Sequence, residues 1–216
     1  MLGSGLPDAM SLLGAFEVAG VAIFALTGAL AAGRNRLDPF GYAMLATVTG
    51  IGGGTLRDML LSRPVFWIGN PRDLYVCVAV SLMMFLLGRL RPTMPAYLGN
   101  GLVLQYADAA GLALFAVIGA LIARDAGAPW FVALALGAIT ASFGGIVRDV
   151  LTGETTLILR SEIYVTAAAL GAGTTLAALD LGAGRTLAML AGFVMAYALR
   201  MAAIRFSWSL PTSPKS

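Results

Sequence analysis

Three consecutive glycines, followed closely by an arginine and an aspartate, stand inside an apolar segment that reads Ile51-Gly52-Gly53-Gly54-Thr55-Leu56-Arg57-Asp58. Glycine destabilises a helix by about 1 kcal/mol relative to alanine, and ionised side chains are costly in lipid. The pattern occurs again as Phe143-Gly144-Gly145-Ile146-Val147-Arg148-Asp149. A segment that only had to cross a membrane would not combine these features, so we expect both copies to serve the protein's function.

The composition predicts an integral membrane protein. Of the 216 residues, 59% are apolar and only 12% are charged, whereas a soluble domain carries about 25% charged residues. A transmembrane helix needs roughly 20 mostly apolar residues. Seven segments meet this requirement, at about 11–32, 39–61, 72–90, 102–123, 129–151, 162–180 and 185–206.

The sequence contains an internal repeat. When it is shifted by 91 positions, residues 17–61 align with residues 108–152, and 17 of the 45 aligned positions are identical. Both Arg-Asp pairs coincide, and Glu17 aligns with Asp108. Because each copy holds three spans, an odd number, the second copy must cross the membrane in the opposite direction. The result is an inverted repeat about a pseudo-twofold axis in the membrane plane.

We therefore predict an all-α integral membrane protein with seven transmembrane helices, namely two inverted three-helix repeats and a seventh helix outside the symmetry. Repeat one covers about 11–91, repeat two about 102–181 and the seventh helix about 185–206, within a single transmembrane domain over 1–206. Residues 207–216 are rich in serine and proline, and we expect them to form a disordered cytoplasmic tail.

The positive charges predict the orientation. With Arg57 and Arg148 set aside, because they lie within spans, eight Lys and Arg residues fall on one side of the predicted membrane and four on the other. The side with eight is expected to be cytoplasmic. The N-terminus then lies outside and the C-terminus inside.

Missing residue types disfavour several classes of function. The chain has no histidine, so a Ser-His-Asp triad or a histidine metal site cannot form. Neither a GxGxxG dinucleotide turn nor a GxxxxGK(S/T) phosphate loop occurs. Cys77, the one cysteine, is expected to be a small buried apolar residue. We therefore expect neither an enzyme, nor a cofactor or structural metal, nor a nucleic-acid partner.

The glycines allow two interpretations. They could break a helix near the middle of the membrane, where freed carbonyls would line a water-filled path, or they could let two helix backbones approach closely. We favour the break for the five glycines beside the Arg-Asp pairs, which are Gly52, Gly53, Gly54, Gly144 and Gly145. We favour close packing for four glycines of the first and fourth helices, which are Gly20, Gly28, Gly111 and Gly119.

The predicted orientation sorts the charges within the spans into two sets. The outer set is Glu17, Arg57 and Asp58, and the inner set, by the repeat, is Asp108, Arg148 and Asp149. Each set has two acids and one arginine, and such a pair of sets would make a water-filled path more favourable for cations than for anions. The arginines could equally brace a broken helix against a neighbouring acid. Brace and gate both remain open.

Four hydroxyl side chains close to the glycines are candidates to line the path: Thr49, Thr55, Thr140 and Ser142. A hydrogen bond from each hydroxyl to the backbone of its own helix explains any one of them at least as well.

Together these residues resemble those of the prokaryotic trimeric intracellular cation (TRIC) channels. The resemblance covers about residues 11–206 and rests on the doubled Gly-Gly and Arg-Asp motif within two repeats and a seventh helix. It implies a multi-pass homotrimer in the plasma (inner) membrane of a prokaryote, surrounded by lipid. Each protomer would hold its own potassium-permeable pore, bordered by the kinked second and fifth helices. Phe143 stands where repeat one has Gly52, so the second break is expected to be milder.

Two hypotheses for the function follow. The first is a monovalent cation channel, with potassium or sodium as the permeant ion and the Arg-Asp pairs as constrictions or gates at opposite ends. The second is a secondary transporter of a small solute such as an amino acid, because inverted repeats with broken helices suit alternating access at least as well as a pore. The residues alone do not separate the two, and the resemblance favours the channel.

Overall fold

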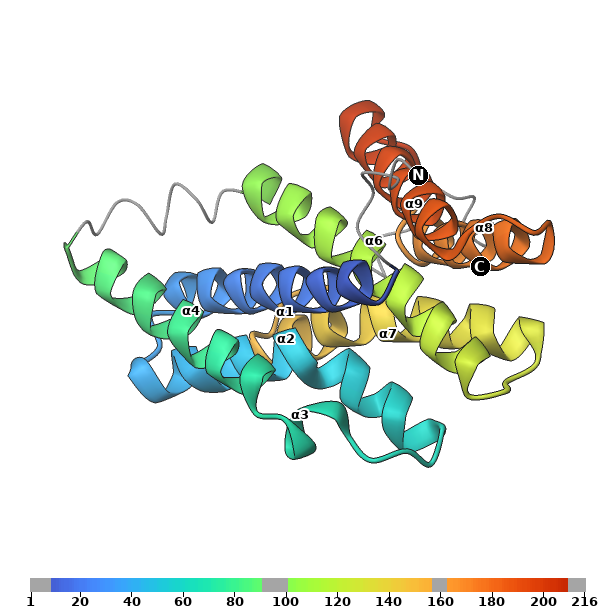
Figure 1. The fold of residues 1–216 in the computed structure, drawn as a ribbon. Helices are drawn as coiled ribbons and strands as arrows, with labels where there is room; N and C mark the ends of the chain where they lie inside the picture. Colours follow the sequence, from blue (N-terminus) through green and yellow to red (C-terminus); the bar gives the residue numbers. More distant parts are fainter. Residues whose placement is uncertain (1–8, 91–100, 157–162, 210–216) are drawn as a thin grey trace, which may run out of the picture.

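The structure is a computed structural model that describes residues 9–90, 101–156 and 163–209. Figure 1 shows its helices gathered into one bundle. In chain order they are α1 (Ala9–Arg34), α2 (Pro39–Leu60), α3 (Phe66–Gly69), α4 (Arg72–Leu90), α6 (Gly101–Asp125), α7 (Trp130–Leu151), α8 (Val165–Asp180) and α9 (Arg185–Phe206).

Each of the seven expected segments contains one long helix, and the short α3 lies between α2 and α4. Five of the helices are long and apolar enough to cross a membrane: α1, α4, α6, α7 and α9. The expected all-helical membrane protein is thereby confirmed. α8 is apolar but has only 16 residues, and α2 carries the glycines and Arg57-Asp58 in its second half. Residues 210–216 of the expected disordered tail lie outside the described residues.

The backbone turns follow the repeat found in the sequence. Arg36 and Gly127, which are 91 residues apart, both have a positive φ, at 53° and 81°. Ser62 and Gly153 are related by the same shift and have φ values of 52° and 67°. A left-handed residue just past a helix end is a common way to terminate the helix and turn the chain. The two copies therefore reverse direction at equivalent places.

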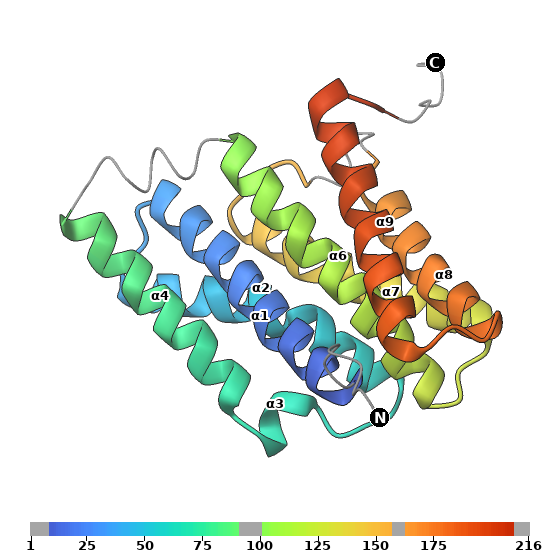
Figure 2. The same ribbon diagram turned by 45° about the horizontal axis from the view of Figure 1, so that its top comes forward.

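The two repeats meet across α1 and α6, which lie side by side and antiparallel in Figure 2. The rings of Phe24 and Phe115 stack with 5.3 Å between their centroids. Gly20 lies against the Phe115 ring, and Gly111 lies against the Phe24 ring. Each contact is the repeat equivalent of the other, as a pseudo-twofold axis requires.

Two further glycines bring α1 against α2 and α6 against α7. A Cβ atom added to Gly28 would lie 2.6 Å from the carbonyl oxygen of Leu45, and one added to Gly119 would lie 2.9 Å from the Cα of Gly137. Alanine would not fit at either position without a shift of the neighbouring backbone. Close packing, the interpretation favoured for the glycines of the first and fourth helices, is therefore confirmed.

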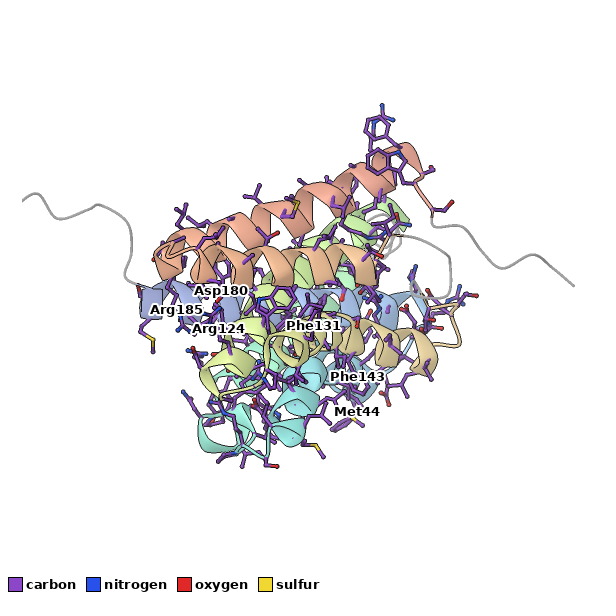
Figure 3. The ribbon with its side chains drawn as sticks, turned by 90° about the vertical axis from the view of Figure 1, so that its right-hand side faces the viewer. Met44, Arg124, Phe131, Phe143, Asp180 and Arg185 are labelled. Carbon is purple, nitrogen blue, oxygen red and sulfur yellow. The ribbon has the colours of Figure 1, made fainter. Side chains whose placement is uncertain are left out.

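The helix outside the repeats, α9, packs against α6 and α8. Figure 3 shows three charged side chains, Arg124, Asp180 and Arg185, gathered at one end of these helices. Arg124 forms an ion pair with Asp180 at 2.7 Å, and Arg185 forms one with Asp125 at 2.6 Å. The pairs are partly exposed, and exposed ion pairs contribute little to stability. The burial of α9 against its neighbours must therefore do most to fix its position.

Candidate functional site

The glycines beside the Arg-Asp pairs form the contact between α2 and α7. Gly53 lies directly against the carbonyl oxygen of Thr140, and Gly144 lies directly against the carbonyl oxygen of Thr49. A Cβ atom on either glycine would collide with that oxygen. Because 49 corresponds to 140 and 53 to 144 in the repeat, the two contacts are related by the pseudo-twofold axis, which passes through this crossing.

The break expected at these glycines is not confirmed. Both α2 and α7 are continuous α-helix through them. The structural role of Gly53 and Gly144 is the close approach of two backbones, which is the alternative that the sequence left open. Gly54 leaves room for the ring of Phe66, at 2.7 Å from an added Cβ, and Gly52 has its nearest neighbour, Phe143, at 4.0 Å.

The inner set comes together as expected. Arg148 donates from Nε to Asp149 at 2.9 Å and from Nη1 to Asp108 at 2.9 Å. Nη1 also donates to the hydroxyl of Thr27 at 3.0 Å. Arg148 and Asp108 are each only 1% exposed, so the guanidinium is held by α6, by α1 and by its own helix. A buried ion pair that loses one partner costs about 3–5 kcal/mol, and this arginine therefore acts as a brace in the conformation seen here.

The outer set is assembled differently from the prediction. Arg57, 2% exposed, donates from Nε to Asp58 at 2.9 Å, and its guanidinium lies 5.7 Å from the centre of the Phe66 ring. Asp58 also accepts from the backbone N–H of Phe66 at 3.0 Å. Glu17 does not bond to Arg57; it is paired with Arg72 at 3.1 Å. Arg72 stands at the start of α4, which lies outside the aligned part of the repeat. The alignment therefore could not show that Arg72, rather than Arg57, is the partner of Glu17.

The outer set therefore has more members than the sequence predicted. In the outer cluster, Arg72 also bonds to Asp73 at 3.2 Å, so two arginines face three carboxylates. At the inner cluster, the buried Arg200 of α9 lies over the ring of Tyr164. The outer cluster keeps one negative charge.

The four candidate hydroxyls all bond to the backbone of their own helices. Thr49 donates to Leu45 and its repeat equivalent Thr140 donates to Leu136, both at 2.6 Å. Ser142 and Thr55 donate at 2.8 Å to carbonyls four residues earlier, those of Ala138 and Ile51. Thr55 also accepts from the indole N–H of Trp67 at 2.9 Å. Their place in a path for ions stays a prediction.

Sequence reasoning missed Thr27, Tyr164 and Arg200. The internal repeat could not reveal Thr27, because the equivalent residue in the second copy is Ile118. Arg200 was counted with the positive charges at the cytoplasmic end of the last helix, but it is 1% exposed. A signal was available for Arg200, since an arginine that is flanked by apolar residues and stands five positions before the next arginine points to burial within a span.

An apolar groove runs along α2 beside this site. Its volume is about 360 Å³, and it is lined by Thr47, Val48, Ile51, Gly52, Thr55, Leu56, Met59, Trp67 and Phe143. Gly52 and Phe143 are repeat equivalents, and both of them line this groove. Within the described ranges, His, Cys, Asp and Glu form no group that could hold a metal ion.

Comparison with known proteins supports the repeat directly. A family model described as Glycine transporter matches the chain twice, over residues 14–89 and 105–180. The two matches are offset by the same 91 residues as the internal repeat. UPF0126 inner membrane protein YadS from Escherichia coli K12 is 41% identical over 198 residues, which cover 91% of this chain and 93% of that protein. A UPF0126 membrane protein from Vibrio cholerae is 43% identical, over 94% of this chain and 83% of that one.

A solved structure, that of the TRIC trimeric intracellular cation channel orthologue from Rhodobacter sphaeroides, is 42% identical and superposes with a TM-score of 0.84. The match covers 92% of this chain and all of that one. The chain belongs to the prokaryotic TRIC family. The resemblance that rests on the doubled glycine and Arg-Asp motif is thereby confirmed. The membrane location is also confirmed, because the chain has helices that could cross a membrane and the E. coli relative is named an inner membrane protein. The TRIC fold thus carries both buried arginine clusters of this chain.

Proposed function

We propose that this TRIC family member is a monovalent cation channel, permeable to potassium, with a pore within each protomer. The observation that carries the proposal is the 42% identity with the R. sphaeroides TRIC orthologue over 92% of the chain. The two arginine clusters support it, because Arg57 and Arg148 are each buried beside the α2–α7 crossing. Water and ions could pass only if these clusters rearrange, which makes Arg57 and Arg148 candidate gates as well as braces.

The proposal extends to the arrangement in the membrane. We infer seven spanning helices, with α2 and α8 crossing in addition to the five that meet the length and hydropathy requirement. Helix α2 would bend at Gly52, Gly53 and Gly54 when the pore opens, and α7 would bend less at its two glycines. The N-terminus would face outward and the C-terminus the cytoplasm.

We further propose a homotrimer, as the name of the R. sphaeroides structure describes that protein. The permeant ion would be potassium or sodium, with lipid around the assembly and without a cofactor, catalytic activity or nucleic-acid partner. The excess negative charge of the outer cluster would favour cations over anions at that end.

Single-channel recording of the purified protein in planar bilayers tests the proposal. Under a potassium chloride gradient, we expect unitary currents whose reversal potential lies near that of potassium. Arg148→Ala is expected to change open probability or conductance. Arg63→Ala removes a positive charge from an exposed loop and serves as the matched control, with currents like those of the unaltered protein. The absence of current in the unaltered protein would count against a channel.

A second candidate is supported by the name of the matching family model, Glycine transporter. An inverted repeat with a central crossing also suits alternating access. Uptake of labelled glycine into proteoliposomes separates the two functions. Saturable, ion-coupled uptake without unitary currents would favour the transporter.

A further inference from the structure

The last helix, α9, contacts the inner arginine cluster indirectly, because its Arg200 packs on an aromatic ring that belongs to the cluster. The guanidinium carbon of Arg200, in α9, lies 5.2 Å from the centre of the Tyr164 ring, within the range of a cation–π contact. Arg200 also donates to the carbonyl oxygen of Ile163 at 3.4 Å. Both side chains are almost completely buried. Arg200 therefore holds the segment that leads into α8 from two sides.

Tyr164 in turn places its hydroxyl beside the Asp108–Arg148 pair. A Cβ atom added to Gly145 would lie 3.0 Å from this hydroxyl, 3.5 Å from Asp108 Oδ1 and 3.7 Å from Arg148 Nη2. The missing side chain of Gly145 is what lets the three groups converge. A side chain at this position would crowd the Tyr164 hydroxyl, so glycine here leaves room for the cluster.

Two polar atoms at this point are complementary and unsatisfied. Asp108 uses Oδ1 for Arg148, and its Oδ2 has no hydrogen-bond partner among the described residues. The Tyr164 hydroxyl, which can donate one hydrogen bond, has no partner among them either. Buried polar groups left unpaired are costly. A small rotation of the tyrosine, or one bridging water, would satisfy both.

We propose that Tyr164 is a latch on the inner gate and that Arg200 positions it. In the closed state, the Tyr164 hydroxyl bonds to Asp108 Oδ2, directly or through one water, while Asp108 Oδ1 holds Arg148. Arg148 is buried in this state, so a wet path at the inner end requires it to leave Asp108. Loss of the tyrosine hydrogen bond removes the contact that orients Asp108 toward Arg148, which favours the open state. Helix α9, which lies outside the repeats, thereby acts on one gate only.

The repeat supports this asymmetry. Leu74-Tyr75-Val76 aligns with Ile163-Tyr164-Val165 at a shift of 89 residues. Tyr75 is 66% exposed and lies in α4, whereas Tyr164 is buried against Arg200. The outer cluster has Arg72 bonded to Glu17 in place of a tyrosine latch. The two gates are therefore built from different parts although the helices that carry them are equivalent.

The inference rests on the proposed channel function and is tested by Tyr164→Phe, which keeps the ring and the cation–π contact but removes the hydroxyl. We expect single-channel open probability to rise on the order of tenfold, the factor for loss of one hydrogen bond to a charged group. Arg200→Gln should act in the same direction, and Arg200→Lys less. Tyr75→Phe is the matched control and should leave open probability unchanged. A Tyr164→Phe channel that gates like the control would overturn the latch.

A measurement without current separates this inference from the channel itself. In a double-mutant cycle on thermal unfolding, Tyr164→Phe and Asp108→Asn should be coupled, so that the second substitution has less effect once the first is made. Additive effects would overturn the contact whether or not the protein conducts. Coupling in a protein that carries no current would instead retain the contact and reject the channel.

Discussion

The carbonyl oxygen of Thr140 lies against Gly53 so closely that an added methyl group would collide with it, and the same is true of Thr49 and Gly144. The colliding atoms belong to the backbones of two helices, so neither can move aside alone. The α2–α7 crossing therefore depends on glycine at these two positions.

Gly53→Ala should destabilise the protein by about 1–3 kcal/mol, the cost of overpacking a close contact. Gly52→Ala is the matched control, because its nearest neighbouring atom is 4.0 Å away and alanine is the better helix former. We expect a lower unfolding temperature in detergent for Gly53→Ala and an unchanged or higher one for Gly52→Ala. Equal stability of the two variants would contradict the close crossing.

The glycine pattern shows where sequence reasoning reached its limit. A doubled Gly-Gly before Arg-Asp fits a broken helix and a close crossing equally well, since the difference lies in which backbone stands opposite. The positions of the helices and the grouping of Arg148 with Asp108 could be predicted, because hydropathy and the internal repeat can both be read directly from the sequence. The ion pair between Glu17 and Arg72 depends on how α4 packs. The contact between Arg200 and Tyr164 depends on how α9 packs. Neither helix was constrained by the aligned part of the repeat.

Thr27→Val should weaken the inner cluster without removing a charge. The Thr27 hydroxyl accepts from Arg148 and donates to the carbonyl of Phe24. Valine has nearly the same shape but cannot accept, and hydrogen bonds to charged groups contribute about 1.5–3 kcal/mol. Thr49→Val, which loses only a bond to its own helix, should cost less. Thermal unfolding of both variants under one condition measures the difference, and a larger loss in Thr49→Val would argue against Thr27 as a support of Arg148.

Glu17 and Asp108 are equivalent in the repeat but should respond very differently to neutralisation. The Glu17 carboxylate is partly exposed and pairs with the still more exposed Arg72, and such pairs contribute about 0–1 kcal/mol. Asp108 is buried against Arg148, so Asp108→Asn leaves a buried charge with one carboxylate fewer. We expect Glu17→Gln to unfold near the temperature of the unaltered protein and Asp108→Asn to unfold well below it. Similar losses in both variants would mean that the two acids play the same part after all.

Cys77 offers a direct measure of these stabilities. Its thiol is fully buried in α4 and faces Gly50 of α2, where an added Cβ would lie 2.9 Å from Sγ. A thiol-reactive dye should therefore label the folded protein very slowly and label it rapidly once α4 separates from α2. We expect labelling on heating to follow the loss of the folded peak in gel filtration, and Gly53→Ala should shift both to lower temperature. Cys77→Ala should give no labelling at any temperature. Rapid labelling of the unheated protein would show that α2 does not cover this thiol in solution.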